Sequence, residues 1–263
     1  MPFTLAHPAA VLPLRRLRLM HTVPLIIGAM TPDVPYYLPW RIAKHIPDLT
    51  HTLLGTFTLD LPFGLLLLLF VWLLRAPLLE PLGPAARAKC GAAIERFGSQ
   101  PRNWALAPLS ILVGAWTHLA WDSFTHADGW MVERIPALSG PVSLFSYTGQ
   151  LCHVLQYASS VFGLTVLAIW FIRLPTPASA REPGNGGRTT GGPVLVAMIF
   201  AAAAAVGGFQ TAQHLGWHLH PEYHLLYLLL TRTIAWFAAL YTLAGMTILA
   251  VRRRAAAASV AQI

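Results

Sequence analysis

Charged side chains are scarce in this chain of 263 residues: Asp, Glu, Lys and Arg together make up 11% of it, and hydrophobic residues make up 56%. Soluble globular proteins carry about 25% charged residues. The composition therefore excludes an ordinary soluble protein and predicts one integral membrane domain over residues 1–263. Cysteine is also scarce. Cys90 and Cys152 form neither a disulfide framework nor a C-x-x-C motif, so we expect both thiols to be free.

Long apolar stretches dominate the chain. A helix needs about 20 apolar residues to cross roughly 30 Å of hydrocarbon. Five stretches meet this length: Leu53–Leu74, Ala105–Thr125, Leu151–Ile172, Pro193–Leu215 and Leu225–Val251. Two shorter ones, Pro8–Leu19 and Thr22–Met30, precede them, and we interpret these as half-helices that dip into the membrane and return. The alternative is a sixth full span over residues 19–38. The sequence predicts an all-α, polytopic transmembrane helical bundle with five full spans plus the short pair.

The net charge of +8 is concentrated in short segments between apolar stretches, which is typical of topology signals rather than of nucleic-acid binding. If the five spans alternate, the basic segments 75–104, 173–192 and 252–254 lie on one side. The positive-inside rule makes that side cytoplasmic. We therefore expect a cytoplasmic loop over residues 75–104, a flexible cytoplasmic linker over residues 173–192, and a cytoplasmic carboxyl terminus.

Three ionisable residues, His118, Asp122 and His126, follow one another at intervals of four near the end of the second long stretch. At this spacing they share one helix face. Each costs about 2.5–3.5 kcal/mol near the middle of a membrane, so something must compensate. A divalent cation, with zinc the leading candidate, is one interpretation, and a polar seam between helices is the other. In the alternating topology His51 and His153 lie at the same outer end of the bundle.

Motifs in the first half of the chain carry a resemblance to known proteins. They are Met1-Pro-Phe-Thr-Leu-Ala-His7-Pro, Gly28-Ala-Met-Thr-Pro32-Asp33 and Thr50-His51-Thr-Leu-Leu-Gly55. With them the chain resembles an uncharacterised family of bacterial multi-pass membrane proteins, known chiefly as a domain of unknown function. The order of motifs is similar to that of membrane-bound metal-dependent hydrolases and, more distantly, of the zinc-dependent phospholipase C fold. The resemblance implies a bacterial inner-membrane protein with ligand roles for His7, Asp33, His51, His118 and Asp122.

Further roles follow from position. The full set of candidate metal ligands is His7, Asp33, His51, His118, Asp122, His126 and His153. Whichever of Asp33 and Asp122 is not a ligand could act as the catalytic base. Asp60 and Arg232, each about two turns inside its span, are candidate substrate-binding residues. Asp60 would face the cavity and bind or orient a ligand, and the guanidinium group of Arg232 would bind a phosphate. Alternatively, Asp60 satisfies backbone groups freed by Pro62, and Arg232 snorkels or pairs with an acid.

Together these features predict a membrane-bound metal-dependent hydrolase that uses a metal-activated water. We expect the site to face the outer side, where membrane lipids surround it and a lipid or lipid-linked ester or phosphodiester is a plausible substrate. Two alternatives stay open: a transporter of metal ions or protons that uses the same residues, and a non-catalytic membrane assembly protein whose His/Asp cluster holds the bundle together. The sequence sets neither the oligomeric state nor the number of metals.

Overall fold

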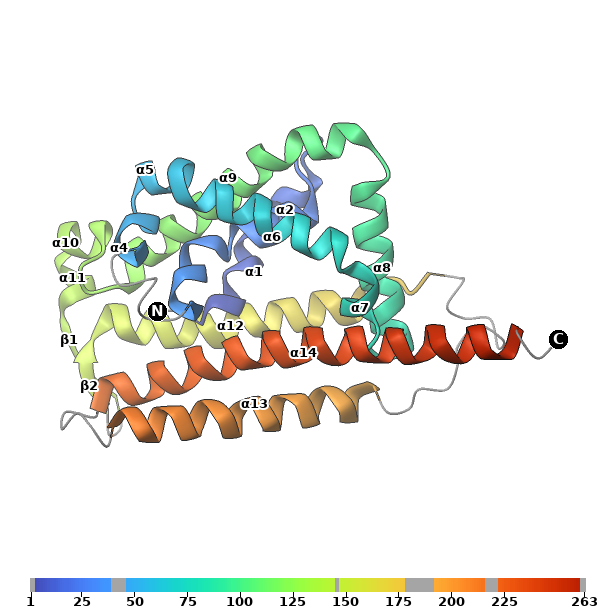
Figure 1. Ribbon diagram of the computed structural model, residues 1–263. Helices are drawn as coiled ribbons and strands as arrows, with labels where there is room; N and C mark the ends of the chain where they lie inside the picture. Colours follow the sequence, from blue (N-terminus) through green and yellow to red (C-terminus); the bar gives the residue numbers. More distant parts are fainter. Residues whose placement is uncertain (1–2, 39–45, 145–146, 178–191, 216–221, 261–263) are drawn as a thin grey trace. The chain divides into compact units, whose positions relative to one another are not determined.

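Helices account for almost all of the secondary structure (Figure 1). The computed structural model describes residues 3–38, 46–144, 147–177, 192–215 and 222–260. Five helices within these ranges are long and apolar enough to cross a membrane: Leu53–Leu73, Pro101–Thr125, Leu151–Arg173, Gly192–Gln213 and Leu225–Ser259. The chain is therefore an integral membrane protein. The predicted all-α, polytopic transmembrane helical bundle is confirmed.

The chain forms two compact units. The first contains residues 1–35, 40–69 and 96–174, and the second contains residues 36–39, 70–95 and 175–263. All of the sequence-predicted metal ligands belong to the first unit. The two units are described separately below.

The N-terminal segment of the first unit is built from short helices. They are η1 (Thr4–Ala6), α1 (Pro8–Val11), η2 (Leu14–Arg16), α2 (Thr22–Gly28) and η3 (Thr31–Tyr37). None is near the length of a full span, so the described residues do not form the alternative sixth span. The first part of this segment, from Phe3 to Arg15, runs along α12 (Leu151–Arg173). The Phe3 amide donates to Ser160 Oγ at 2.9 Å, and the Arg15 guanidinium lies 5.4 Å from the centre of the Trp170 ring.

The second part of the N-terminal segment, which contains α2, runs along α9 (Pro101–Thr125), the longest helix of this unit. The His21 amide donates to Ser110 Oγ at 3.2 Å. One turn later, a Cβ atom on Gly114 would lie 2.5 Å from the carbonyl oxygen of Leu25. Glycine therefore lets the two backbones touch, as small residues do in packed membrane helices. The N-terminal segment therefore runs along α12 and then returns along α9, as predicted for the pair of half-helices.

The first long span combines three elements: α5 (Leu53–Gly55), η4 (Thr56–Asp60) and α6 (Leu61–Leu73). The middle element, η4, is a single π-helical turn. The indole of Trp116 on α9 donates to Thr56 Oγ in this turn at 3.1 Å. Before the span, α4 (Ile46–Thr50) brings the chain back toward the N-terminal segment.

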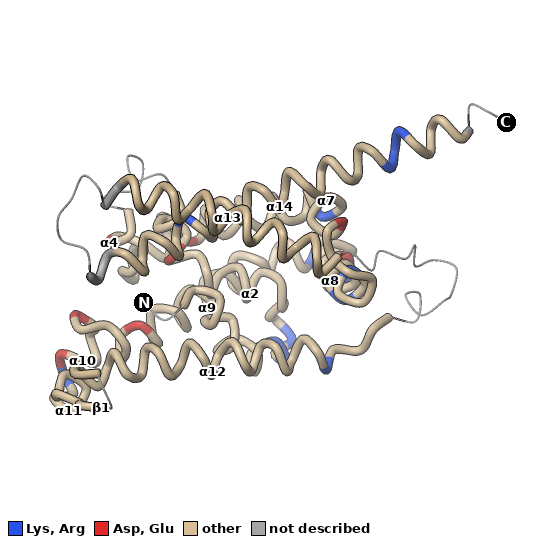
Figure 2. The backbone as a smooth tube through the Cα atoms, turned by 90° about the horizontal axis from the view of Figure 1, so that it is seen from below, with Lys and Arg blue, Asp and Glu red and all other residues tan. Residues whose placement is uncertain are grey.

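Short elements connect α9 to α12: α10 (Trp130–Arg134), α11 (Pro136–Ser139) and the strands β1 (Pro141–Leu144) and β2 (Tyr147–Gln150). The strands pair antiparallel, with Pro141 opposite Gln150. In Figure 2 the acidic residues of this unit lie toward the end that carries α4 and α10, and its basic residues lie mostly toward the other end of α12. The first unit is therefore polarised in charge along its helices.

The second unit contains α7 (Arg75–Leu79), most of α8 (Pro84–Gly98), α13 (Gly192–Leu215) and α14 (Glu222–Val260). Helices α13 and α14 lie side by side (Figure 1). The Tyr241 hydroxyl on α14 donates to the Leu78 carbonyl at 2.8 Å, and Arg252 pairs with Glu80 at 2.5 Å. The predicted loop 75–104 therefore contains helices, and most of the predicted linker 173–192 lies outside the described residues.

Candidate metal centre

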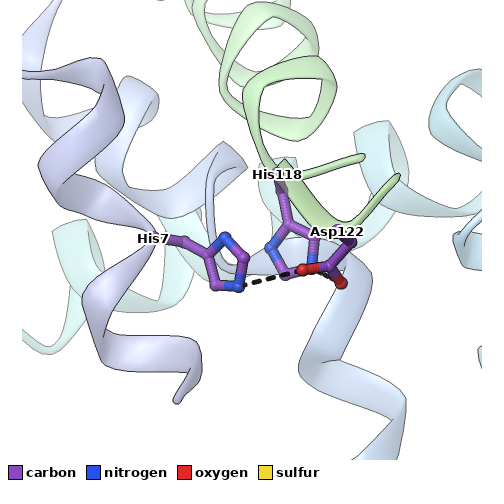
Figure 3. A group of neighbouring side chains, drawn as sticks. All are labelled: His7, His118 and Asp122. Carbon is purple, nitrogen blue, oxygen red and sulfur yellow. Dashed lines mark ion pairs between the residues drawn. The ribbon is translucent and has the colours of Figure 1, made fainter. Parts of the chain in front are cut away.

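Five side chains from four segments of the first unit converge on one point. They are His7, between η1 and α1; Asp33, in η3; His51, just after α4; and His118 and Asp122, both on α9. Four of them are at most 5% exposed, and the His51 side chain is 21% exposed. Figure 3 shows the His7 imidazole lying against His118 and pointing its Nε2 atom at the Asp122 carboxylate. The ring centroids of His7 and His118 are 3.7 Å apart.

The nitrogen–oxygen distances within this cluster are nearly uniform. The shortest joins His118 Nε2 to Asp122 Oδ2 at 3.2 Å. The others are 3.6 Å from His118 Nε2 to Asp33 Oδ1, 3.6 Å from His51 Nε2 to Asp33 Oδ1, 3.6 Å from His51 Nε2 to Asp122 Oδ2, and 3.5 Å from His7 Nε2 to Asp122 Oδ1. Charge-assisted hydrogen bonds are about 2.7–2.9 Å long. A tetrahedral zinc with bonds of about 2.0–2.1 Å holds neighbouring ligand atoms about 3.3 Å apart. The spacing fits ligands around a cation better than hydrogen-bonded pairs.

The facing atoms also lack other partners. Among the described residues, His7 Nε2, His118 Nε2, Asp33 Oδ1 and both Asp122 carboxylate oxygens are buried without a hydrogen bond. Leaving one buried polar group unsatisfied costs about 1–3 kcal/mol, and more when it is charged. A divalent cation bound by His7, His118 and Asp122, or by Asp33, His51 and His118, would satisfy the facing atoms of that group. Imidazole nitrogen and carboxylate oxygen are ligands that zinc accepts.

Backbone carbonyl groups orient two of the imidazoles. His118 Nδ1 lies 2.9 Å from the Ala29 carbonyl oxygen, and His51 Nδ1 lies 2.8 Å from the Pro47 carbonyl oxygen. A carbonyl accepts only from a protonated nitrogen, so each Nδ1 carries the proton and each Nε2 presents its lone pair to the centre. Metal-binding histidines are usually fixed in this way.

Two threonines position the carboxylate of Asp33 and bring His51 beside it. The Thr4 hydroxyl donates to Asp33 Oδ2 at 2.6 Å, which leaves Oδ1 to face the imidazoles. The Thr50 hydroxyl donates to the Pro32 carbonyl at 2.8 Å. That bond ties α4 to the segment that carries Asp33, and the next residue after Thr50 is His51. Hydrogen bonds between segments that are separate in the sequence therefore set the geometry of this half of the centre.

The pKa values of the residues outside the spans fit ligand roles. Burial, reinforced by the charge of His118, lowers the pKa of His7 to about 3, so its imidazole is neutral near pH 7. Burial raises the pKa of the Asp33 carboxyl, but His118, His51 and His7 outweigh this, and the net pKa is below its ordinary value. Burial lowers the pKa of His51, whereas Asp33 raises it, and the net result is a raised pKa.

The other predicted residues fall into three groups. His126 caps the end of α9 and places Nδ1 3.4 Å from Asp122 Oδ2, at the border of the cluster. His153, on the first turn of α12, is in neither group of converging ligand atoms found among the described residues, so its ligand role stays a prediction. Asp60 is buried at the end of η4, and Arg232 lies on α14 in the second unit. Sequence reasoning did not find the Thr4 hydroxyl or the two carbonyl groups.

A family model described as a domain of unknown function, DUF4184, matches residues 1–250 of the chain. The chain belongs to that family. The match extends well beyond the motifs in the first half of the chain that carried the resemblance. No curated protein matches the chain, and no solved structure matches it either.

Two groups of three ligand atoms describe the centre of this DUF4184 protein. One contains His7, His118 and Asp122, the other contains Asp33, His51 and His118, and in each group the atoms lie within 4.8 Å of one another. Both groups contain His118, so they form one continuous centre rather than two separate sites. The matched region contains every residue of this centre. The arrangement can hold a divalent cation in a buried, mostly desolvated position.

Proposed function

We propose that this DUF4184 protein is a metal-dependent hydrolase of a bacterial inner membrane that cleaves an ester or phosphodiester bond in a lipid or lipid-linked substrate. One observation carries the proposal: buried ligand atoms without hydrogen bonds, contributed by distant segments, face one another at 3.2–3.6 Å. A polar seam that only joined helices would have shorter distances and satisfied atoms.

His51, His118, Asp33 and Asp122 would hold the cation, with His7 completing the set on the other side of Asp122. Zinc is the cation we propose, because the donors are imidazole nitrogens and carboxylate oxygens. When bound, it would lower the pKa of a coordinated water to about 7 and so supply a nucleophile at neutral pH. The resemblance to membrane-bound metal-dependent hydrolases points to the same chemistry.

The residues of the chain prepare the centre before any substrate arrives. The Ala29 and Pro47 carbonyl groups fix the tautomers of two histidines, and the Thr4 hydroxyl fixes one oxygen of Asp33. Because these partners are rigid backbone groups or short side chains, little reorganisation is needed on binding. Burial of the cluster excludes bulk water and strengthens each electrostatic interaction.

The site is proposed to face the outer side of the membrane. Arg102, at the start of α9, is 20 positions before Asp122, which corresponds to about 30 Å along the helix. Basic residues mark the cytoplasmic end of such helices, so we propose that Asp122 lies at the opposite, outer end. The basic residues 252–254 support a cytoplasmic carboxyl terminus in the same way. A site at the end of an apolar span is accessible to lipids. In the second unit, Arg232 has a buried Nη1 without a hydrogen bond among the described residues, and we propose that it binds a lipid phosphate group.

The experiment is metal analysis of protein purified in detergent, combined with hydrolysis of a chromogenic phosphodiester and of phospholipid vesicles. His118→Ala and His51→Ala should lose both bound zinc and hydrolysis. The matched control is His21→Ala, because the His21 ring packs against Phe97 and lies outside the cluster. His153→Ala tests whether that residue is a ligand. Full zinc content in His118→Ala would overturn the proposal. Zinc flux into proteoliposomes without any hydrolysis would replace the hydrolase with a transporter.

A further inference from the structure

The N-terminal segment turns at a group of exposed basic and apolar side chains. Residues 15–19, here called the basic tip, have the sequence Arg-Arg-Leu-Arg-Leu and lie between α1 and α2. Arg16 and Arg18 are exposed, and Leu17 and Leu19 are 53% and 48% exposed. A hydrogen bond of 3.0 Å from the Met20 amide to the Leu17 carbonyl closes the turn. The metal centre uses none of these residues.

Contacts with α12 place the basic tip far from the metal centre. Phe3, four residues before His7 of the centre, contacts Ser160. The Arg15 guanidinium lies over the ring of Trp170, which is about 15 Å further along the same helix. Trp170 is in the last turn of α12, and tryptophan is enriched where membrane helices leave the hydrocarbon. The basic tip therefore lies at a membrane–water interface, on the side away from the metal centre.

The positive charge of the basic tip is not balanced by acidic side chains. Among the described residues, the arginines that form ion pairs are Arg75, Arg87, Arg134 and Arg252. The three arginines of the basic tip form none within that part of the chain, and neither does Arg173, one turn after Trp170. Figure 2 shows that the basic residues of this unit lie mostly toward this end of α12. The guanidinium groups are therefore available to an anion from outside the chain.

The mixture of arginine and leucine indicates which anion fits. A guanidinium group matches the geometry of phosphate oxygens. A soluble anion would need the arginines alone, and so would a topology signal, which is read from positive charge. The exposed leucines between the arginines are instead suited to the boundary between headgroups and acyl chains, where apolar side chains are buried beside basic ones. Basic clusters at this depth attract anionic lipids.

We propose that the basic tip binds the phosphate group of an anionic phospholipid in the leaflet opposite the metal centre. The two exposed arginines donate to the phosphate oxygens, the two leucines contact the upper part of the acyl chains, and Arg15 stays on the Trp170 ring. The bound lipid holds the turn between the two parts of the segment that carry His7 and Asp33. This second site does not depend on the proposed hydrolase function.

The test is native mass spectrometry of delipidated full-length protein in detergent, titrated with phosphatidylglycerol or with phosphatidylcholine of the same acyl chains. Arg16→Gln and Arg18→Gln should each raise the Kd of this site for phosphatidylglycerol about 5-fold, and the double variant about 30-fold. The double variant should therefore bind one molecule fewer at low lipid concentration. Arg134→Gln is the matched control and should bind as the wild type does. Its guanidinium also lies over a tryptophan ring, Trp130 at 3.9 Å, but it pairs with Glu133.

Several results would overturn the proposal, and none requires a measurement of hydrolysis. Equal numbers of bound phosphatidylglycerol in the wild type and in a folded double variant would do so, with folding verified by thermal unfolding. Equally tight binding of phosphatidylcholine would do so too. Displacement of the lipid by millimolar inorganic phosphate would assign the site to a soluble anion instead. The wild type alone gives a further test, because sodium chloride should weaken the binding of phosphatidylglycerol, and binding that is insensitive to salt would contradict the role of the arginines.

Discussion

Replacing Thr4 by valine removes one hydroxyl group and leaves the shape of the side chain almost unchanged. In the native protein that hydroxyl donates to Asp33 Oδ2 at 2.6 Å, and both residues are buried, with Thr4 4% exposed and Asp33 fully buried. Without the donor, the second oxygen of Asp33 has lost its partner, and the carboxylate is free to rotate. The ligand oxygen is then no longer held toward the imidazoles.

The size of the effect follows from this geometry. Loss of one partner that orients a metal ligand typically weakens metal binding about 10–100-fold. We therefore expect the Kd of Thr4→Val for zinc to rise by that factor, equivalent to about 1.4–2.7 kcal/mol. Competition with a chromogenic zinc chelator in detergent measures the Kd directly and requires no substrate.

Thr4→Ser is the matched control, because serine keeps the hydroxyl and loses only a methyl group. Its Kd should stay close to the wild-type value. Two results would refute the reasoning: an unchanged Kd in a folded Thr4→Val protein, or an equal loss in both variants, which would assign the effect to packing rather than to the hydrogen bond.

Two further predictions concern packing and pH. Gly114→Val should destabilise the protein and weaken zinc binding, because its Cβ would lie 2.5 Å from the Leu25 carbonyl oxygen. Gly208→Ala is the control and should be tolerated, because the nearest atom to its Cβ would lie at 3.8 Å. Thermal unfolding and zinc content measure both variants, and a normal unfolding temperature for Gly114→Val would contradict the close packing of α2 on α9. Burial lowers the folded-state pKa of His7 to about 3, so below its ordinary pKa of 6.5 the unfolded chain binds a proton that the folded chain does not. The zinc-free protein should therefore lose up to about 1.4 kcal/mol of unfolding free energy per pH unit from this group as the pH falls below 6.5. Thermal unfolding across pH 5–8 measures this, and the unfolding temperature of His7→Asn should depend less steeply on pH than that of the wild type. An unchanged pH dependence would exclude His7 as the cause.

The spans were predictable because hydropathy over about 20 residues is a strong signal. The first predicted span, Leu53–Leu74, differs by one residue from the observed Leu53–Leu73. Its π turn has no comparable signature, since the composition of Thr56–Asp60 does not distinguish a π turn from an α-helix. Helix α8 lies within the segment predicted as a cytoplasmic loop between spans, and its mixture of apolar and charged residues gives no membrane signal.

The candidate site was only partly predictable. His118 and Asp122 share a helix face, so their spacing was enough to place them together. His126 continues the same interval, but α9 ends at Thr125 and the backbone of His126 is extended, which moves it to the border of the cluster. The pair of half-helices brought His7 and Asp33 to the same side as the other candidates, and their ligand roles came from the resemblance. Their approach depends on contacts between segments that no local pattern records.

The same contacts explain why the site and the fold depend on each other. The Ala29 carbonyl that orients His118 reaches the centre only because α2 packs closely on α9, and that approach depends on Gly114. The hydrogen bond from the Phe3 amide to Ser160 Oγ holds residue 3 against α12, four residues before His7. A cation bound at this point would connect the η1–α1 junction and η3, both in the N-terminal segment, with the end of α4 and with α9. These parts of the chain, of which only α9 is long enough to cross a membrane, would then share one fixed point, so metal binding would also contribute to the stability of the N-terminal segment.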